Sequence, residues 1–66
     1  MKLIINGDEK IVNSNKSIEQ IMIDLEIIDK VMACAVNMDI VKKENWRSYI
    51  PKENDKIELL QFVGGG

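Results

Sequence analysis

The chain has 66 residues, enough for one small domain, and 45% of them are hydrophobic, as in folded proteins. It has no histidine and one cysteine, which excludes His-based catalysis, a zinc site of the usual Cys/His kind and an intramolecular disulfide. Eleven acidic and nine basic residues give a net charge of −2, whereas nucleic-acid binders usually carry a strong basic surface.

The lone cysteine fits a reducing cytoplasm. The first residues, MKLIINGDEK, form neither a signal peptide nor a membrane span. We therefore expect a cytoplasmic protein that binds neither nucleic acid nor a membrane.

The chain begins with a predicted hairpin. Residues 2–5, with the apolar run Leu3 to Ile5, predict a strand, and Asn6-Gly7 predicts a tight turn because both residues tolerate a positive φ. We place Asp8 and Glu9 in the turn region as well. The chain is then expected to return as a second strand over residues 10–12.

A helix is predicted over residues 17–26. Ser17 suits the N-cap position, and Gln20 stands where its side chain closes a capping box. Hydrophobic residues recur at helical spacing along one face: Ile18, Ile21, Met22 and Leu25. We interpret this face as core packing.

The next predicted strand, over residues 31–37, alternates in side-chain size. Met32, Cys34 and Val36 are expected on one face, and two alanines on the other. Cys34 is interpreted as a small buried hydrophobe, because a reactive cysteine needs exposure and a nearby positive charge or helix N-terminus.

The remainder predicts two more strands. Residues 40–41 form a short strand, and residues 42–50 are irregular, with at most one helical turn and with Trp46 covering an edge of the core. Residues 51–55 form a turn before the last strand, residues 56–63.

This order, β-β-α-β-β-β, predicts an α+β fold with a mixed sheet of four to five strands and one helix packed on one face. The first and last strands are the most apolar, so we expect them side by side in the sheet centre, joined through a right-handed crossover. This is the β-grasp, or ubiquitin-like, fold. The predicted core residues are Ile4, Ile18, Met22, Leu25, Cys34, Val36, Ile57 and Leu59.

The last strand presents two different faces. Glu58 would be costly in a core, so its face is predicted to be the outer one. Leu60 and Phe62 share that face, and we predict that they dock a partner. Two alternatives remain: they are ordinary exposed hydrophobic residues, or the loop that holds Trp46 covers them.

Residues 64–66 are three glycines at the end of the sequence, and we expect a flexible tail. Glycines lack a Cβ and can thread a channel too narrow for other residues. A terminal carboxylate is a poor electrophile, but an ATP-using enzyme could convert it into an acyl-adenylate, from which a sulfur nucleophile could displace AMP.

The chain resembles the ThiS family of sulfur carrier proteins, which serve thiamine biosynthesis. The resemblance covers essentially the whole chain. The matching segments are Ile4-Ile5-Asn6-Gly7, Ala35-Val36-Asn37 with Ile40-Val41, Trp46, Asn54-Asp55-Lys56-Ile57 and Phe62-Val63-Gly64-Gly65-Gly66. Lys42 and Lys43 replace a proline and an arginine common in the family, Glu53-Asn54-Asp55 replaces Asp-Gly-Asp, and Gly64 precedes the family's glycine pair.

The resemblance implies a protein cosubstrate that catalyses no step and needs no cofactor or metal. A ThiF-type adenylating enzyme would activate the Gly66 carboxylate, with Gly64 and Gly65 threading its site. Sulfur originating from cysteine, by way of a desulfurase, would form a thiocarboxylate, and thiazole synthase would take that sulfur.

Three alternatives remain open. The small subunit of molybdopterin synthase is another sulfur carrier with this fold and tail. A ubiquitin-like interaction module would use Leu60 and Phe62 without tail chemistry. An RNA-binding β-grasp domain is opposed by the acidic charge balance.

Overall fold

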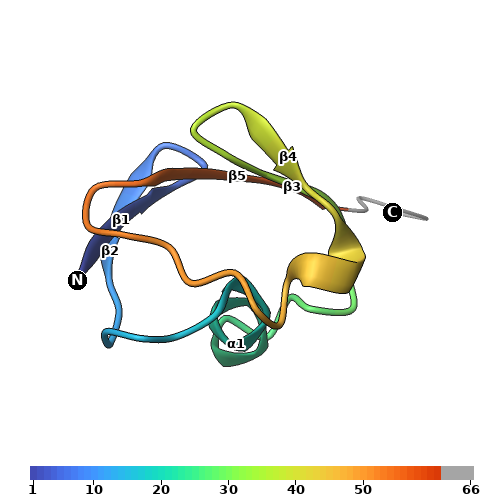
Figure 1. The fold of residues 1–66 in the computed structure, drawn as a ribbon, viewed down its shortest axis with the longest axis horizontal. Coiled ribbons are helices and arrows are strands. Elements are labelled where there is room, and N and C mark those ends of the chain that lie inside the picture. Colours follow the sequence, from blue (N-terminus) through green and yellow to red (C-terminus); the bar gives the residue numbers. More distant parts are fainter. Residues whose placement is uncertain (62–66) are drawn as a thin grey trace.

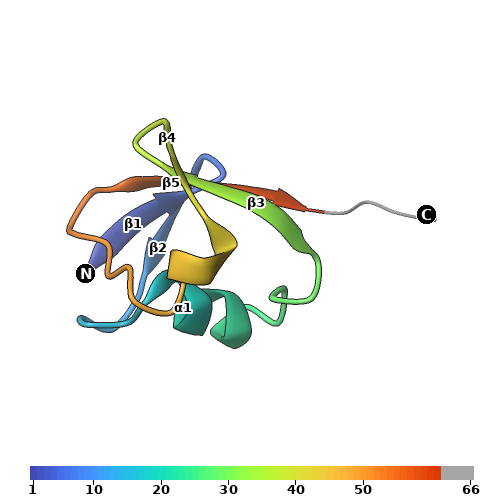
Figure 2. The same ribbon diagram turned by 45° about the vertical axis from the view of Figure 1, so that its right-hand side comes forward.

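The computed structural model describes residues 1–61, and within them one helix lies against one face of a five-stranded sheet (Figures 1 and 2). The elements are β1 (Lys2–Ile5), β2 (Asp8–Ile11), α1 (Ile18–Asp24), β3 (Val31–Val36), β4 (Asp39–Val41), the short 3-10 helix η1 (Lys43–Asn45) and β5 (Lys56–Gln61). The strand order across the sheet is β2-β1-β5-β3-β4. The predicted α+β class and the single covering helix are confirmed.

The first and last strands lie side by side in the middle of the sheet, as predicted. β1 and β5 run parallel, with Ile4 opposite Lys56 and Ile5 opposite Ile57. β3 runs antiparallel to β5 on its other side. The parallel pair makes the sheet mixed, and it puts β5 between two neighbouring strands.

Both hairpins turn on two residues, the first of which is an asparagine. Asn6 and Gly7 have φ of 50° and 87°, and Asn37 and Met38 have φ of 50° and 74°. This left-handed region matches the twist of a two-residue hairpin. The predicted longer turn through Glu9 is wrong, because Asp8 already pairs with Ile5 in β2.

Helix α1 begins directly after Ser17, and the predicted capping box is confirmed. The Gln20 backbone N–H donates to Ser17 Oγ at 3.2 Å, and the Ser17 backbone N–H donates to Gln20 Oε1 at 3.2 Å. The helix ends at its C-cap, Leu25, and Glu26 follows with φ of 61°. This left-handed residue explains why the helix stops short of the predicted end.

The core fills the space between α1 and the sheet. Two of the predicted core residues, Ile4 and Leu25, are not fully buried. Ile4 is only half-buried, because its neighbours on β1, Leu3 and Ile5, take the two core positions. Leu25 is partly buried and packs against the core from outside. The buried hydrophobic residues are Leu3, Ile5, Ile18, Ile21, Met22, Val31, Cys34, Val36, Val41, Trp46, Ile57 and Leu59.

A β-bulge changes which face of β3 carries Met32. Val31 is opposite Gln61 and Ala33 is opposite Leu60, so one residue of β3 is extra between them. An extra residue reverses the alternation on one side of the bulge. Val31 is therefore buried and Met32 is 61% exposed, and the prediction that Met32 shares the core face of Cys34 is wrong.

Trp46 closes one edge of the core, as predicted. Its side chain is buried, and its indole N–H donates to the Val41 carbonyl at 2.9 Å. The Glu19 backbone N–H donates to the Trp46 carbonyl, which ties the start of α1 to this segment.

No helix in residues 1–61 combines the length and apolarity needed to cross a membrane.

Candidate functional site

Strand β5 leads toward the C-terminal glycines, and its two faces have opposite environments. Ile57 and Leu59 are buried in the core, whereas Lys56, Glu58 and Leu60 are exposed. Leu60 is 62% exposed, so the predicted outward register is confirmed for this residue. The pairing of Cys34 with Leu59 across β3 and β5 accounts for it, because paired residues share a face and Cys34 is in the core.

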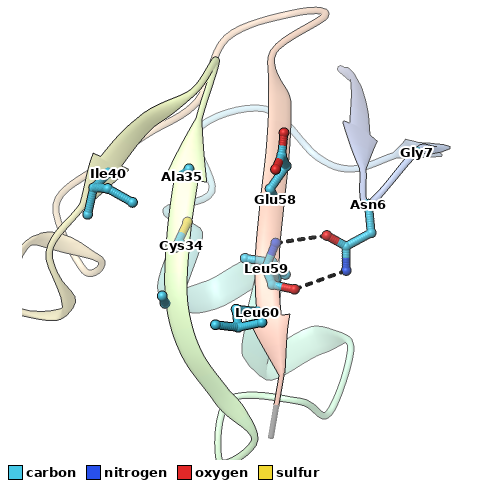
Figure 3. Close-up of a pocket in the computed structure, with 9 residues that line it drawn as sticks. Asn6, Gly7, Cys34, Ala35, Ile40, Glu58, Leu59 and Leu60 are labelled. Carbon is cyan, nitrogen blue, oxygen red and sulfur yellow. Dashed lines mark hydrogen bonds between the residues drawn. The ribbon is translucent and has the colours of Figure 1, made fainter. Parts of the chain in front are cut away.

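An open, mostly apolar hollow surrounds Leu60 on the sheet face that α1 does not cover (Figure 3). Ala33 and Ala35 of β3 form its floor and Ile40 of β4, 72% exposed, forms one side. These small residues on β3 leave the hollow open between the larger side chains of β4 and β5. Trp46 is buried in the core, so the alternative that its loop covers Leu60 is wrong.

The side chain of Asn6 makes a contact with β5 that sequence reasoning missed. The Leu59 backbone N–H donates to Asn6 Oδ1 at 2.8 Å, and Asn6 Nδ2 donates to the Leu59 carbonyl at 3.3 Å (Figure 3). As a sequence pattern, Asn-Gly indicates only a turn. The choice of asparagine over the equally turn-compatible glycine is the one sequence signal that points to a side-chain role.

Asn37 holds the beginning of β5 in a similar way. The Lys56 backbone N–H donates to Asn37 Oδ1 at 3.0 Å, and Asn37 Nδ2 donates to Asp55 Oδ1 at 3.0 Å. The turn asparagines of both hairpins therefore hold β5, one near its start and one near its end.

Cys34 has the character of a core residue. It is 1% exposed, and burial raises the pKa of its thiol from 9.0 to about 11. The thiol is therefore protonated near neutral pH and is a weak nucleophile. Within residues 1–61, no cluster of three or more Cys, Asp or Glu side chains is placed to hold a metal ion.

The remaining predicted site residues, Phe62 and Gly64 to Gly66, lie outside the described residues. Strand β5 extends to Gln61, which directly precedes them in the sequence. The structure therefore shows the strand that leads to the glycines and the surface beside it.

Known proteins similar to this chain agree in family and fold. A family model described as the ThiS family matches residues 3–66. The chain is 26% identical over 66 residues to the sulfur carrier protein ThiS of Escherichia coli, with 100% of both proteins covered. It is 32% identical over 66 residues to a thiazole synthase of Paramagnetospirillum magneticum, of which it spans only 20%.

The fold also matches a solved structure. The crystal structure of the thiamine biosynthesis protein ThiS from Geobacter metallireducens has a TM-score of 0.79 with this chain, at 24% identity, and 100% of both chains are covered. This match supports the β-grasp fold. Because the family model extends over nearly the whole sequence, the chain belongs to the ThiS family.

Proposed function

We propose that the chain is a sulfur carrier protein of thiamine biosynthesis, and that Gly66 carries the sulfur as a thiocarboxylate. The observation that carries this proposal is the family match, which runs through the three glycines to residue 66. The E. coli relative named as a sulfur carrier aligns over its full length, which supports the same function.

The proposed chemistry takes place on the C-terminal carboxylate of a chain that ends at Gly66. A ThiF-type adenylating enzyme joins this carboxylate to AMP from ATP and releases pyrophosphate. A desulfurase takes sulfur from cysteine as a persulfide, which then attacks the acyl carbon, and AMP leaves with one carboxylate oxygen. A thiol reduces the resulting acyl disulfide, which releases the thiocarboxylate and leaves the sulfur donor in a disulfide with that thiol. Gly64 and Gly65 thread the enzyme's channel, since they have no side chain to obstruct it. The chain is thus a cosubstrate.

Partner docking is proposed at Leu60 and Phe62. The exposure of Leu60 and the apolar hollow beside it support this assignment, because such a surface is suited to burial against another protein. Phe62 joins the proposal through its predicted register alone. We further propose one domain over residues 1–66, with 64–66 as a flexible tail, working in the cytoplasm.

Thiazole synthase is the proposed acceptor of the sulfur. Two proteins named thiazole synthase, from Paramagnetospirillum magneticum and Magnetococcus marinus, each contain a stretch similar to this whole chain. A carrier-like stretch within a protein of that name supports a working partnership between the two. The alternative is that the chain is the small subunit of molybdopterin synthase, and finding which synthase copurifies with it separates the two functions.

The direct test is a loading assay. The protein is incubated with a ThiF-type enzyme, ATP, a desulfurase, cysteine and a thiol reductant, and its intact mass is measured. The proposal predicts the mass increase for replacement of one oxygen by sulfur, dependent on ATP. An unchanged mass with a demonstrably active enzyme mixture would refute it. Transfer of the sulfur to thiazole synthase, but not to molybdopterin synthase, then identifies the pathway.

A further inference from the structure

Strand β5 continues beyond the end of its neighbour β1. The Ile4 backbone N–H donates to the Asp55 carbonyl at 3.0 Å, and the Asn6 backbone N–H donates to the Ile57 carbonyl at 2.9 Å. The chain then reverses at Asn6-Gly7 and enters β2. The backbone of β1 therefore offers no partner to β5 at Leu59.

The Asn6 side chain takes the place of the missing backbone. Its carboxamide offers a carbonyl oxygen and N–H donors, as the peptide group does, and it accepts from the N–H of Leu59 and donates to the Leu59 carbonyl (Figure 3). The backbone of Asn6 is left-handed, with φ of 50°, in the conformation that places this side chain beside β5. The side chain thereby extends the ladder on this side of β5 by one position.

This contact lies where β5 is least regular on its other side. Past Leu59, the pairing with β3 passes through the bulge between Val31 and Ala33. A bulge disrupts the ladder locally. The two hydrogen bonds between Asn6 and Leu59, which we call the Asn6 clamp, therefore affect the direction in which β5 leaves the sheet toward the C-terminal residues.

We propose that Asn6 is a positioning residue for sulfur loading, which clamps Leu59 and so directs the C-terminal segment into the activating enzyme. This inference rests on the proposed function. A clamp at the root of the tail acts on orientation, and small errors in the position of a reacting atom lower the rate steeply. Asn6 also lines the edge of the hollow beside Leu60, but the docking side chain itself is held by the pairing of Leu60 with Ala33 of β3, so we expect it to stay in place without the clamp.

Asn37 provides the matched control. It also occupies the first position of a two-residue turn with φ of 50°, and its side chain accepts from the Lys56 N–H at the opposite end of β5. Glycine fits the backbone of both positions. Asn6→Gly and Asn37→Gly therefore each remove one side-chain clamp from β5, and only the first clamp lies near the tail.

The first measurement is amide hydrogen exchange by NMR, which needs no partner. In Asn6→Gly, protection at Leu59 is expected to fall by about tenfold, since its net hydrogen bond is lost. In Asn37→Gly, the loss is expected at Lys56, with Leu59 close to the parent. Unchanged protection of Leu59 in Asn6→Gly would overturn the clamp.

The second measurement is the loading assay, run with both variants at a temperature where circular dichroism shows them folded. For Asn6→Gly we expect kcat to fall by about tenfold or more with KM within about twofold of the parent. Asn37→Gly is expected to load at the parental rate. Equal rates for the two variants, or a change in KM alone, would overturn the positioning role.

The outcomes also separate this inference from the proposed function. If the parent gains no sulfur, the proposed function and the positioning role both fail, and the exchange data alone decide whether Asn6 clamps Leu59. If the parent loads and Asn6→Gly loads equally well, only the positioning role fails. If Asn6→Gly does not fold, Asn6→Asp replaces it. Its carboxylate still accepts from the Leu59 N–H but cannot donate to the Leu59 carbonyl, so kcat is expected to fall while the protection of Leu59 stays near that of the parent. An unchanged kcat in Asn6→Asp would overturn the positioning role.

Discussion

At the scale of single residues, Leu59 and Leu60 are chemically identical neighbours with different tasks. Leu59 is 6% exposed and belongs to the core, whereas Leu60 is 62% exposed beside the apolar hollow. Their alternation follows from the strand geometry of β5. The pair therefore allows the contributions of folding and docking to be separated on one strand.

Leu59→Ala is expected to lower the free energy of unfolding by about 2–5 kcal/mol, because it leaves a cavity in the core. Leu60→Ala should change it by no more than about 0.5 kcal/mol. Urea unfolding measures both effects. In the loading assay, Leu60→Ala should raise the KM of the activating enzyme for this protein substrate, because the substitution removes a docking side chain. A core-like loss of stability in Leu60→Ala, or an unaltered KM, would contradict this assignment.

Cys34 gives the stability a pH dependence. Burial raises the pKa of its thiol from 9.0 to about 11, so above pH 9 the unfolded chain loses a proton that the folded chain keeps. This contribution to stability is complete below pH 9 and is lost as the pH rises toward 11. Across this range, the free energy of unfolding of the parent should fall by roughly 2–3 kcal/mol more than that of Cys34→Ala.

Urea unfolding of both proteins at several pH values checks this difference. The two proteins share every other residue, so the difference between their pH slopes reports Cys34 alone. Identical pH slopes for the parent and Cys34→Ala would mean that the thiol does not titrate with a raised pKa in the folded state.

At the scale of elements, α1 depends strongly on its first turn. It spans only Ile18–Asp24, and isolated helices of this length are unstable in water. The reciprocal bonds between Ser17 and Gln20 satisfy two backbone groups at the start of the helix. The cap and the burial of one apolar face together hold this short helix against the sheet.

Ser17→Ala should lower the free energy of unfolding by about 1 kcal/mol, because the Gln20 N–H loses its acceptor. Ser14→Ala, in the exposed loop before the helix, is the matched control and should stay within about 0.5 kcal/mol of the parent. Thermal unfolding followed by circular dichroism measures both. Equal effects of the two substitutions would show that the capping box contributes nothing.

The elements that sequence analysis placed well are those with local signals. Asn6-Gly7 marked the first turn and Ser17 with Gln20 marked the helix start, because these signals lie within a few residues of the structure they specify. The exposure of Met32 could not be predicted this way. It depends on the pairing of Val31 and Ala33 with a strand far along the chain.

The contrast between local signals and long-range contacts also explains the other places where the structure differs from the sequence prediction. On β1, three consecutive hydrophobic residues, Leu3 to Ile5, leave the core face undecided until Ile5 is seen to pair with Ile57. The clamp between Asn6 and Leu59 joins residues from opposite ends of the chain. Such contacts become visible only when the sheet is assembled, whereas Leu60 could be assigned because Glu58 fixes the outer face of its own strand.

At the scale of the whole molecule, the fold places the strand that precedes the glycines between two neighbours. β5 pairs with β1 on one side and with β3 on the other, while α1 covers one face of the sheet (Figure 1). A core of this size supports only about 3–5 kcal/mol of net stability. In the proposed function, partners would bind this domain while they act on the glycines.

The central claim is that Gly66 carries the sulfur. The most direct measurement is the intact mass of the protein after the loading reaction, with fragmentation to locate the added atom, on the parent, Gly65→Val and a chain lacking Gly66. Valine adds a branched side chain to the thread, and the deletion shortens it by about 3.3–3.6 Å. Neither change removes a side chain from the core, so both variants should melt like the parent. Sulfur is expected on Gly66 of the parent and on neither variant. Normal loading of both variants, or sulfur located on Cys34, would contradict it.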